Sequence, residues 1–312
     1  MKIKKWTSIC LLLSIANICM AAHDATTIQQ AMGIRLGRLQ NLIVKYEHTR
    51  TTSLPSAVKK KIQENSEKES LVSRRLLGTG TLTTEKEFSF LHGRIRYDSR
   101  LKERKLDLEP PSTFRDHELQ MVSYPGSRVE RLWRTEGSNF YCGLIGQDKK
   151  PNLQNDIEVG LGMKPWGQDV WLNSENLEKM EIALPDSNLA IMTNVDEEGR
   201  IDEWTFDRKF GYALTSYRKR FPPDLHSAIE ITAGKFKNVD TLMLPFSIIS
   251  RTLFWENDKP EVVMEIRIEV HEYKLNDPNN VPERYHIKWP DNSFVFDERT
   301  GFIFSPTDKK SK

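Results

Sequence analysis

The sequence has few of the cysteine and histidine residues that form disulfides and metal sites. Cysteine occurs three times in 312 residues, and Cys10 and Cys19 both lie near the apolar N-terminus. If that N-terminal segment is removed, Cys142 is the one cysteine that remains, and a single thiol forms no internal disulfide. The seven histidines show neither the HExxH motif nor a Cys-His zinc spacing. We therefore expect no cofactor and no metal, and we interpret Cys142 as a small core residue rather than a nucleophile.

Net charge and long apolar runs are equally scarce. The formal charge is only +2, from 46 basic and 44 acidic residues. Such a balance gives no electrostatic footprint for nucleic acid. Beyond the N-terminus no run of 18 apolar residues occurs, so the sequence predicts a soluble chain or one in peripheral contact with a membrane.

Enzyme motifs are also missing, because the sequence has no GxSxG elbow and no kinase motif set. A general base at His92, His117 or His226 has no nucleophile near it in the sequence. Asn194–Gly199 imitates the start of a calcium loop, but Thr205 stands where that loop needs a glutamate. We expect a hairpin turn there and no enzyme. A hydrolase assembled from distant residues is the least favoured alternative.

The N-terminus carries a targeting pattern. A basic start at residues 2–5 precedes a short apolar run at 9–18, and small residues follow. This order predicts a signal peptide over residues 1–21, and hence a periplasmic or secreted protein. The alternatives are a retained membrane anchor, for which the run is short, and a lipid attached at Cys19.

Residues 22–304 are expected to form one domain, followed by a disordered tail at 305–312. Residues 27–45 predict an amphipathic helix, because apolar residues recur there at spacings of three and four. Residues 51–75 form a charged insert of mixed sign, typical of a solvated helix or a linker. A basic patch for acidic lipid headgroups is the alternative interpretation of the insert.

The clearest pattern is the alternation in residues 262–273, VVMEIRIEVHEY. Every second residue from Val262 to Val270 is apolar, and from Met264 on the positions between are Glu265, Arg267, Glu269 and His271. Period-two alternation predicts a long β-strand with one buried and one wet face, which is typical of antiparallel sheets. Similar short segments joined by turn residues predict an antiparallel meander. The expected fold class is therefore mainly β (α+β), with a long curved antiparallel sheet and an N-terminal helix.

A long apolar sheet face must be buried against something. The patterns leave two outcomes open, a packed α+β core or a concave sheet that encloses an apolar cavity. The residues expected to line such a cavity come from the helix and from two strands: Leu36, Leu39, Trp204, Phe206, Met264, Ile266 and Ile268.

Four segments carry a family resemblance: NVDEEGRIDEWTF (194–206), VDTLMLP (239–245), VHEYKLN (270–276) and YHIKWPDNSFVFDERTGFIF (285–304). With the leader and the helix, they resemble periplasmic lipoprotein carriers of the LolA type and outer-membrane lipoprotein-sorting-like proteins. The ending resembles that of planctomycete-type envelope proteins. The resemblance implies an incomplete antiparallel barrel, helices that close an apolar hollow, and transport or binding of an acyl chain.

The resulting hypothesis is a non-enzymatic periplasmic carrier or binding protein for a lipid or a lipid-modified protein. Lipid or lipoprotein cargo, and a protein of the cell envelope, are the expected partners. The first alternative is an exported structural or interaction domain with a packed core and no small ligand.

The leader generates a first prediction. Because the apolar run is followed by small residues, the exported protein should begin at Ala22 or His23. Intact-mass measurement of protein recovered from the periplasm or the medium checks this. Retention of Met1, or the added mass of a diacylglyceryl group on Cys19, would contradict it.

Overall fold

The structure is a computed structural model. It describes the chain except for residues 1–25, 54–78, 107–115, 126–127, 136, 148–155, 164–171, 173–176, 179, 198, 222–226, 257–258 and 307–312. The predicted signal peptide, most of the charged insert and most of the tail therefore lie outside the described residues.

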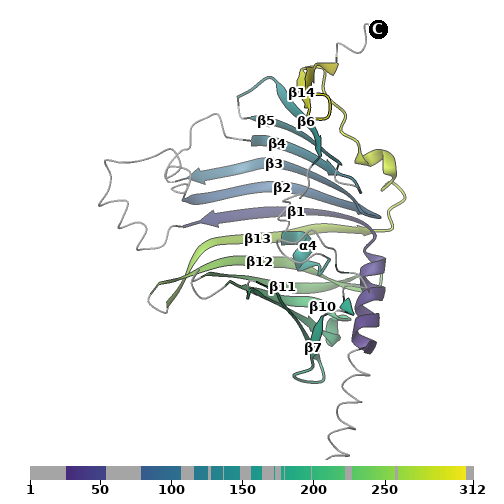
Figure 1. The fold of residues 1–312 in the computed structure, drawn as a ribbon, viewed down its shortest axis with the longest axis vertical. Helices are drawn as coiled ribbons and strands as arrows, with labels where there is room; N and C mark the ends of the chain where they lie inside the picture. The colour runs from purple at the N-terminus through teal and green to yellow at the C-terminus, as the bar shows by residue number, and fades with distance from the viewer. Residues whose placement is uncertain are drawn as a thin grey trace, which may run out of the picture.

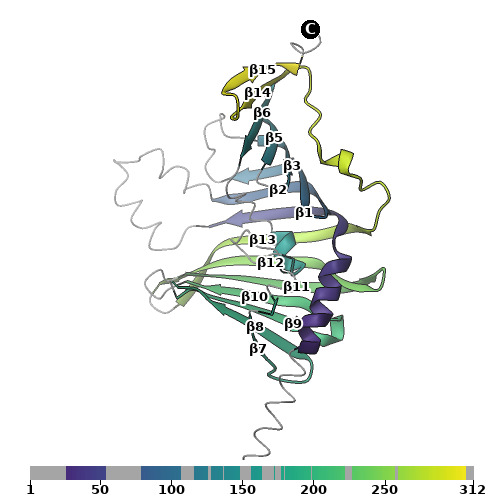
Figure 2. The same cartoon turned by 45° about the vertical axis from the view of Figure 1, so that its right-hand side comes forward.

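Fifteen strands in the described part of the chain form one sheet, in the order β15-β14-β6-β5-β4-β3-β2-β1-β13-β12-β11-β10-β9-β8-β7. The strands are β1 (Asn41–Thr52), β2 (Gly80–Leu91), β3 (Arg94–Leu106), β4 (Asp116–Ser123), β5 (Arg128–Thr135), β6 (Tyr141–Gln147), β7 (Glu181–Ala183), β8 (Leu189–Val195), β9 (Ile201–Asp207), β10 (Ala213–Arg220), β11 (Ser227–Val239), β12 (Leu242–Glu256), β13 (Lys259–Leu275), β14 (Ser293–Asp297) and β15 (Phe302–Phe304). The meanders β2–β6 and β7–β13 meet on the central strand β1, as Figures 1 and 2 show.

The prediction of a mainly β fold built on a meander is confirmed. The sheet is mixed rather than purely antiparallel, because β14 pairs with β6 in parallel. The sheet is also open, since its order ends at β15 on one side and at β7 on the other. β14 arrives at β6 after the chain has passed through all the other strands, and no local turn sets its direction.

The predicted long strand corresponds to β13, in which Ile266, Ile268 and Val270 are buried. A bulge between Lys45 and Tyr46 of β1 shifts the register with β13. One extra residue in a strand moves the following side chains to the other face. Tyr273 and Leu275 are consequently buried beyond the bulge, where the simple alternation places polar residues.

Two predicted boundaries were wrong. The N-terminal helix spans residues 26–38 and ends before β1, rather than at residue 45. β1 begins at Asn41 because Leu42, Val44 and Tyr46 alternate on a buried face, so a period of two replaces the helical period there. Apolar residues from Phe88 to Tyr97 predict a single strand over residues 87–98, but a hairpin turn at His92-Gly93, where both φ angles are positive, interrupts it.

The face of the sheet that meets the N-terminal helix, here called the helix face, carries the main core. Apolar residues of the helix pack there with buried residues of β1–β3 and β8–β13. The short helix α4 (Asp156–Gly160), buried throughout, covers the middle of this face over β10–β12. Gly160 permits its close approach, because a Cβ at that position would lie 2.9 Å from Ile248 Cγ1.

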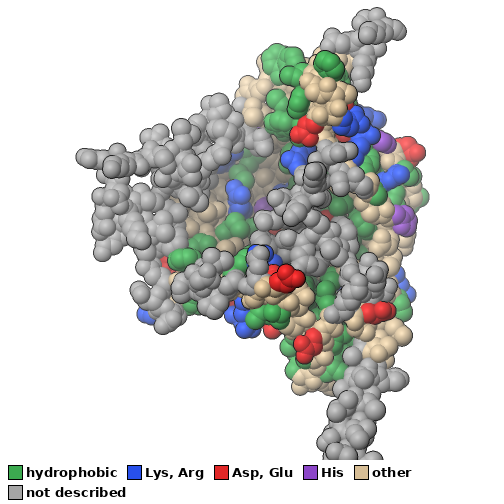
Figure 3. Space-filling view, in the orientation of Figure 1, with side chains coloured by type: hydrophobic (Ala, Val, Ile, Leu, Met, Phe, Trp, Pro, Cys, Tyr) green, Lys and Arg blue, Asp and Glu red, His purple; other side chains and the backbone are tan. Residues whose placement is uncertain are grey.

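The opposite face, here called the outer face, is partly covered by the C-terminal segment. Tyr285, at the end of the 3-10 helix η4 (Pro282–Tyr285), packs with Ile287 on apolar residues of β2, β4 and β5. Asn280 fixes this segment, since its Nδ2 donates to Asn41 Oδ1 at 2.8 Å and to the Phe90 carbonyl at 3.0 Å. The sequence also predicts a strand over residues 285–289, and this prediction is wrong, because the segment has no strand in the structure. Figure 3 shows hydrophobic side chains gathered at the top of the molecule in this view, over β14 and β6.

The packing of α4 generates a second prediction. Gly160→Ala should destabilise the protein by about 1–3 kcal/mol, because the new methyl overpacks against Ile248. Gly234→Ala is the matched control, since an added Cβ meets nothing within 4 Å there. Chemical denaturation measures both variants. Adding Ile248→Val to Gly160→Ala should recover part of the loss, and equal stabilities of the two glycine variants would contradict this packing.

Candidate functional site

The seven residues expected to line a cavity all lie at the helix face. Six of them are buried members of one core cluster, and Met264 packs against that cluster from its edge. The structure therefore brings together residues that are far apart in the sequence. The hollow described among them is small, about 10 Å³, and Leu36 and Phe206 are the two of the seven that line it. Such a volume holds about one water molecule.

Arg35 lines the same hollow, and its position is unusual for a charged residue. It follows Met32 by three residues and precedes Leu36, so it lies on the apolar stripe of the N-terminal helix. Its side chain is only 5% exposed. Nη2 donates to the Met243 carbonyl at 2.7 Å, whereas Nε and Nη1 have no hydrogen-bond partner among the described residues.

Burial lowers the pKa of Arg35 to about 10, and nearby Tyr273 opposes that shift. The guanidinium therefore stays charged at neutral pH. Burial raises the pKa of Tyr273, whose hydroxyl donates to the Pro245 carbonyl. Within the described residues no carboxylate contributes to the shift of Arg35. A buried cation without an anionic partner is costly, so this site suits an anion.

A larger surface hollow opens at the start of the N-terminal helix. Its volume is about 320 Å³, and Ile28, Asp186 and Arg208 are among its lining residues. Tyr212 lines both this hollow and the small one at Arg35. The two hollows therefore share Tyr212 in their linings.

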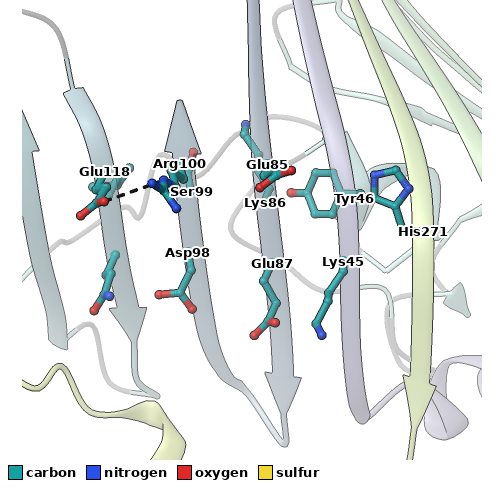
Figure 4. Close-up of a pocket in the computed structure, with 12 residues that line it drawn as sticks. Lys45, Tyr46, Glu85, Lys86, Glu87, Asp98, Ser99, Arg100, Glu118 and His271 are labelled. Carbon is teal, nitrogen blue, oxygen red and sulfur yellow. Dashed lines mark ion pairs between the residues drawn. The ribbon is translucent and has the colours of Figure 1, made fainter. Parts of the chain in front are cut away.

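The largest hollow described is a groove of about 560 Å³ across β1–β4. Figure 4 shows Lys45, Glu87 and Asp98 next to one another on neighbouring strands, as the strand register requires. Their charges are paired: Lys45 with Glu272 at 3.1 Å, Asp98 with Arg96 at 2.7 Å, and Glu87 with Arg284. Charged side chains of both signs line the groove, so it does not select a ligand of one sign.

A third polar group, half-buried, lies between β1, β2 and α4. Burial lowers the pKa of Lys86 to about 7, and Asp156 opposes the shift. The Lys86 ammonium lies 5.3 Å from the centre of the Tyr97 ring. Burial also lowers the pKa of His48 to about 3, and Lys86 adds to that effect. This cluster places a lysine and carboxylates on the helix face beside the apolar core.

Arg35 and Lys86 were not predicted from the sequence as functional residues, because both resemble ordinary charged residues of amphipathic elements. The one available signal was the place of Arg35 within the apolar stripe. Cys142, expected in the core, is exposed. Its neighbour Gly143 is the residue that meets Trp289 and Val295, so Cys142 points to the less covered face.

The histidines named above as possible general bases form no catalytic arrangement in the part of the chain that the structure describes. His92 lies in a turn, His117 lies on β4, and His226 is outside the described residues. Across the described ranges, no group of three His, Cys, Asp or Glu side chains is placed to hold a metal ion. Among those residues, no helix combines the length and apolarity that crossing a membrane requires.

Comparison with known proteins places the chain in no group, because no family model and no curated protein matches it.

Lys86 generates a third prediction. Between pH 7 and 10.5 the unfolded chain binds a proton that folded Lys86 lacks, so stability should rise with pH in that window. Lys86→Met should remove this slope and raise the melting temperature at pH 6, since the half-buried charge is then gone. Melting curves from pH 6 to 9.5 measure it. Lys102→Met, at an exposed ion pair, should keep the wild-type slope, and equal slopes in all three proteins would contradict the assignment.

Proposed function

We propose that this protein is a non-enzymatic binding protein or carrier for an amphipathic anion, taken up between the N-terminal helix and the sheet. The ligand class is an acyl chain that ends in a carboxylate or phosphate, as a lipid or a lipid-modified protein carries. The observation that supports this most directly is Arg35, a buried guanidinium with two unpaired nitrogens beside an otherwise apolar core.

The proposed ligand meets two needs of the site at once. Its head would accept hydrogen bonds from Nε and Nη1 of Arg35 and neutralise the charge. Its tail would replace apolar contacts that the helix now makes with Phe206 and the strands behind it. The groove on the outer face is lined by paired charges of both signs, so it fits an anionic head less well than Arg35 does.

The site is closed in this structure, so uptake requires the helix to move. Separating the helix from the sheet exposes Ile28, Met32, Leu36 and Leu39, at a cost of roughly 1.5–3 kcal/mol each. An acyl chain recovers about 0.8 kcal/mol for each buried CH₂. The total cost of roughly 6–12 kcal/mol is offset by a chain of about 8–15 carbons or more, whereas short ligands do not offset it. Long acyl chains are the ligands that this balance favours.

Besides the Arg35 bond to the Met243 carbonyl, side-chain hydrogen bonds near each end of the described helix would have to break in such a movement. Gln29 donates to the Leu177 carbonyl at 2.8 Å, and Arg38 donates to Thr241 at 2.8 Å near the other end. The carrier role also agrees with the predicted leader and with the resemblance to lipoprotein-sorting proteins. The alternative, an exported domain that binds no small ligand, is favoured by the close packing of the core.

Arg35 generates the fourth prediction. Arg35→Met should weaken binding of a fluorescent long-chain fatty acid at least tenfold, because the tail keeps its contacts and the head loses its partner. Its melting temperature should not fall, since removing an unpaired buried charge offsets the lost bond to Met243. Arg38→Met, also on the helix but exposed, is the control and should bind normally.

The two measurements together separate the possible roles of Arg35. A lower melting temperature with unchanged binding would make Arg35 a structural residue. Wild-type protein that binds neither the fatty acid nor a phospholipid would end the carrier proposal and favour the packed interaction domain.

A further inference from the structure

Lys86 on β2 is a half-buried basic side chain that forms no ion pair and no hydrogen bond within the described residues. Its Nζ lies 5.3 Å from the centre of the Tyr97 ring on β3. Lys45 and Lys102, on the neighbouring strands, are exposed instead, and each forms an ion pair with a glutamate. The surroundings of the Lys86 amine therefore differ from those of an ordinary surface lysine.

Lys86 lies at the border of the main core. On the helix face of β2 it is followed by Phe88 and Phe90, which are both buried in that core. Tyr46 of β1 pairs with Lys86 on one side, as Figure 4 shows, and Ser99 of β3 pairs with it on the other. The amine is still reachable, because its Nζ is not among the fully buried polar atoms of the described residues. An apolar surface and an accessible amine thus meet at one position.

The charges around Lys86 act on the amine in opposite directions. Burial has the largest effect and lowers the pKa of Lys86 to about 7, Asp156 of α4 opposes the shift, and Arg50 of β1 adds to it. The nearby His48 stays neutral, because burial lowers its pKa to about 3. An exposed lysine has a pKa of about 10.4, so the neutral fraction of Lys86 at neutral pH is on the order of 10³ times larger.

A neutral lysine amine in such surroundings is a nucleophile. Proteins activate lysines for attack on carbonyl groups by burying them or by placing a second cation nearby, and Lys86 meets both conditions. An anionic ligand fits this position less well, because Asp156 repels it and the amine is only partly charged. The chemistry of the cluster therefore favours a carbonyl compound.

We propose that Lys86 is a covalent binding site for aldehydes that carry an apolar chain. The amine nitrogen adds to the carbonyl carbon, a proton moves from nitrogen to the former carbonyl oxygen, and loss of one water leaves an imine. No oxidant or reductant takes part. The protonated imine keeps the positive charge of the ammonium, so the attraction of Asp156 stabilises it. The apolar chain would lie on the Tyr97 ring beside the amine.

This site does not rest on the proposed carrier function. Lys86 belongs to the sheet, and imine formation needs neither the guanidinium of Arg35 nor a movement of the N-terminal helix. Arg35→Met should therefore form the imine at Lys86 as the wild type does. Failure of fatty-acid binding and failure of aldehyde binding are in this way separate results.

Reductive trapping tests the site on the wild-type mature protein. The protein is treated with octanal and sodium cyanoborohydride near neutral pH, and the alkylated lysines are located by peptide mass spectrometry. Lys86 should be alkylated at least tenfold faster than Lys45 and Lys102. The preference should disappear in urea, where Lys86 becomes an ordinary lysine. Lys86→Arg keeps the charge without the nucleophile, and it should lose this fast alkylation while Lys45 and Lys102 react as before.

Two further comparisons test the cause of the preference. The ratio of the alkylation rates at Lys86 and Lys102 should fall as the pH rises from about 7 to about 10, because only the amine of Lys102 still gains neutral fraction there. A ratio of this kind cancels the pH dependence of the reductant. The same ratio should be at least threefold higher with octanal than with propanal, since only the longer chain covers the Tyr97 ring.

Three results would overturn the proposal. The first is alkylation of Lys86 that is no faster than that of Lys45 and Lys102 in the folded protein. The second is a ratio of Lys86 to Lys102 alkylation that does not change with pH, which would remove the neutral amine as its cause. The third is an equal ratio with octanal and propanal, which would exclude an apolar chain as part of the ligand.

Discussion

The pairing of β1 with its two neighbours is the constraint on which the fold depends. β1 lies at the centre of the sheet and joins the meander β2–β6 to the meander β7–β13. Its residue Leu42 faces Phe90 on one side and Leu275 on the other, so the pairing spans most of the chain. Asn280 adds a second connection when it binds Asn41 and the Phe90 carbonyl. The helix face and the outer face exist as continuous surfaces only because this strand links both halves.

That constraint explains where polar groups become buried. Once β1 fixes the helix face, the N-terminal helix must lay its apolar stripe on it, and Arg35 lies on the stripe. Lys86 is brought to the same face by its pairing with Tyr46. Neither charge stabilises an apolar core, because desolvation opposes both of them. Groups that cost stability in this way are typical of binding sites, where a ligand supplies the missing partner.

Much of the fold could be predicted from local patterns. The alternation of Ile266, Ile268 and Val270, and the hairpin turn before Ile201, both follow from residues close in sequence. The parallel contact of β14 with β6 could not be predicted, because distant segments determine it. The bulge at His271 of β13 could not be predicted either, since it depends on the pairing with β1. The seven proposed cavity residues do meet in one core, but the small hollow and the buried charge of Arg35 depend on side-chain packing that periodicity does not encode.

The central claim is that the site between the N-terminal helix and the sheet, beside Arg35, holds a long-chain anion in the cell. Native mass spectrometry of wild-type protein, purified without detergent from its own envelope, tests this most directly. The account predicts a bound acyl lipid that carries a carboxylate or phosphate and that is absent from Arg35→Met prepared in the same way. A wild-type protein that carries no lipid, or a lipid retained equally by Arg35→Met, would contradict it.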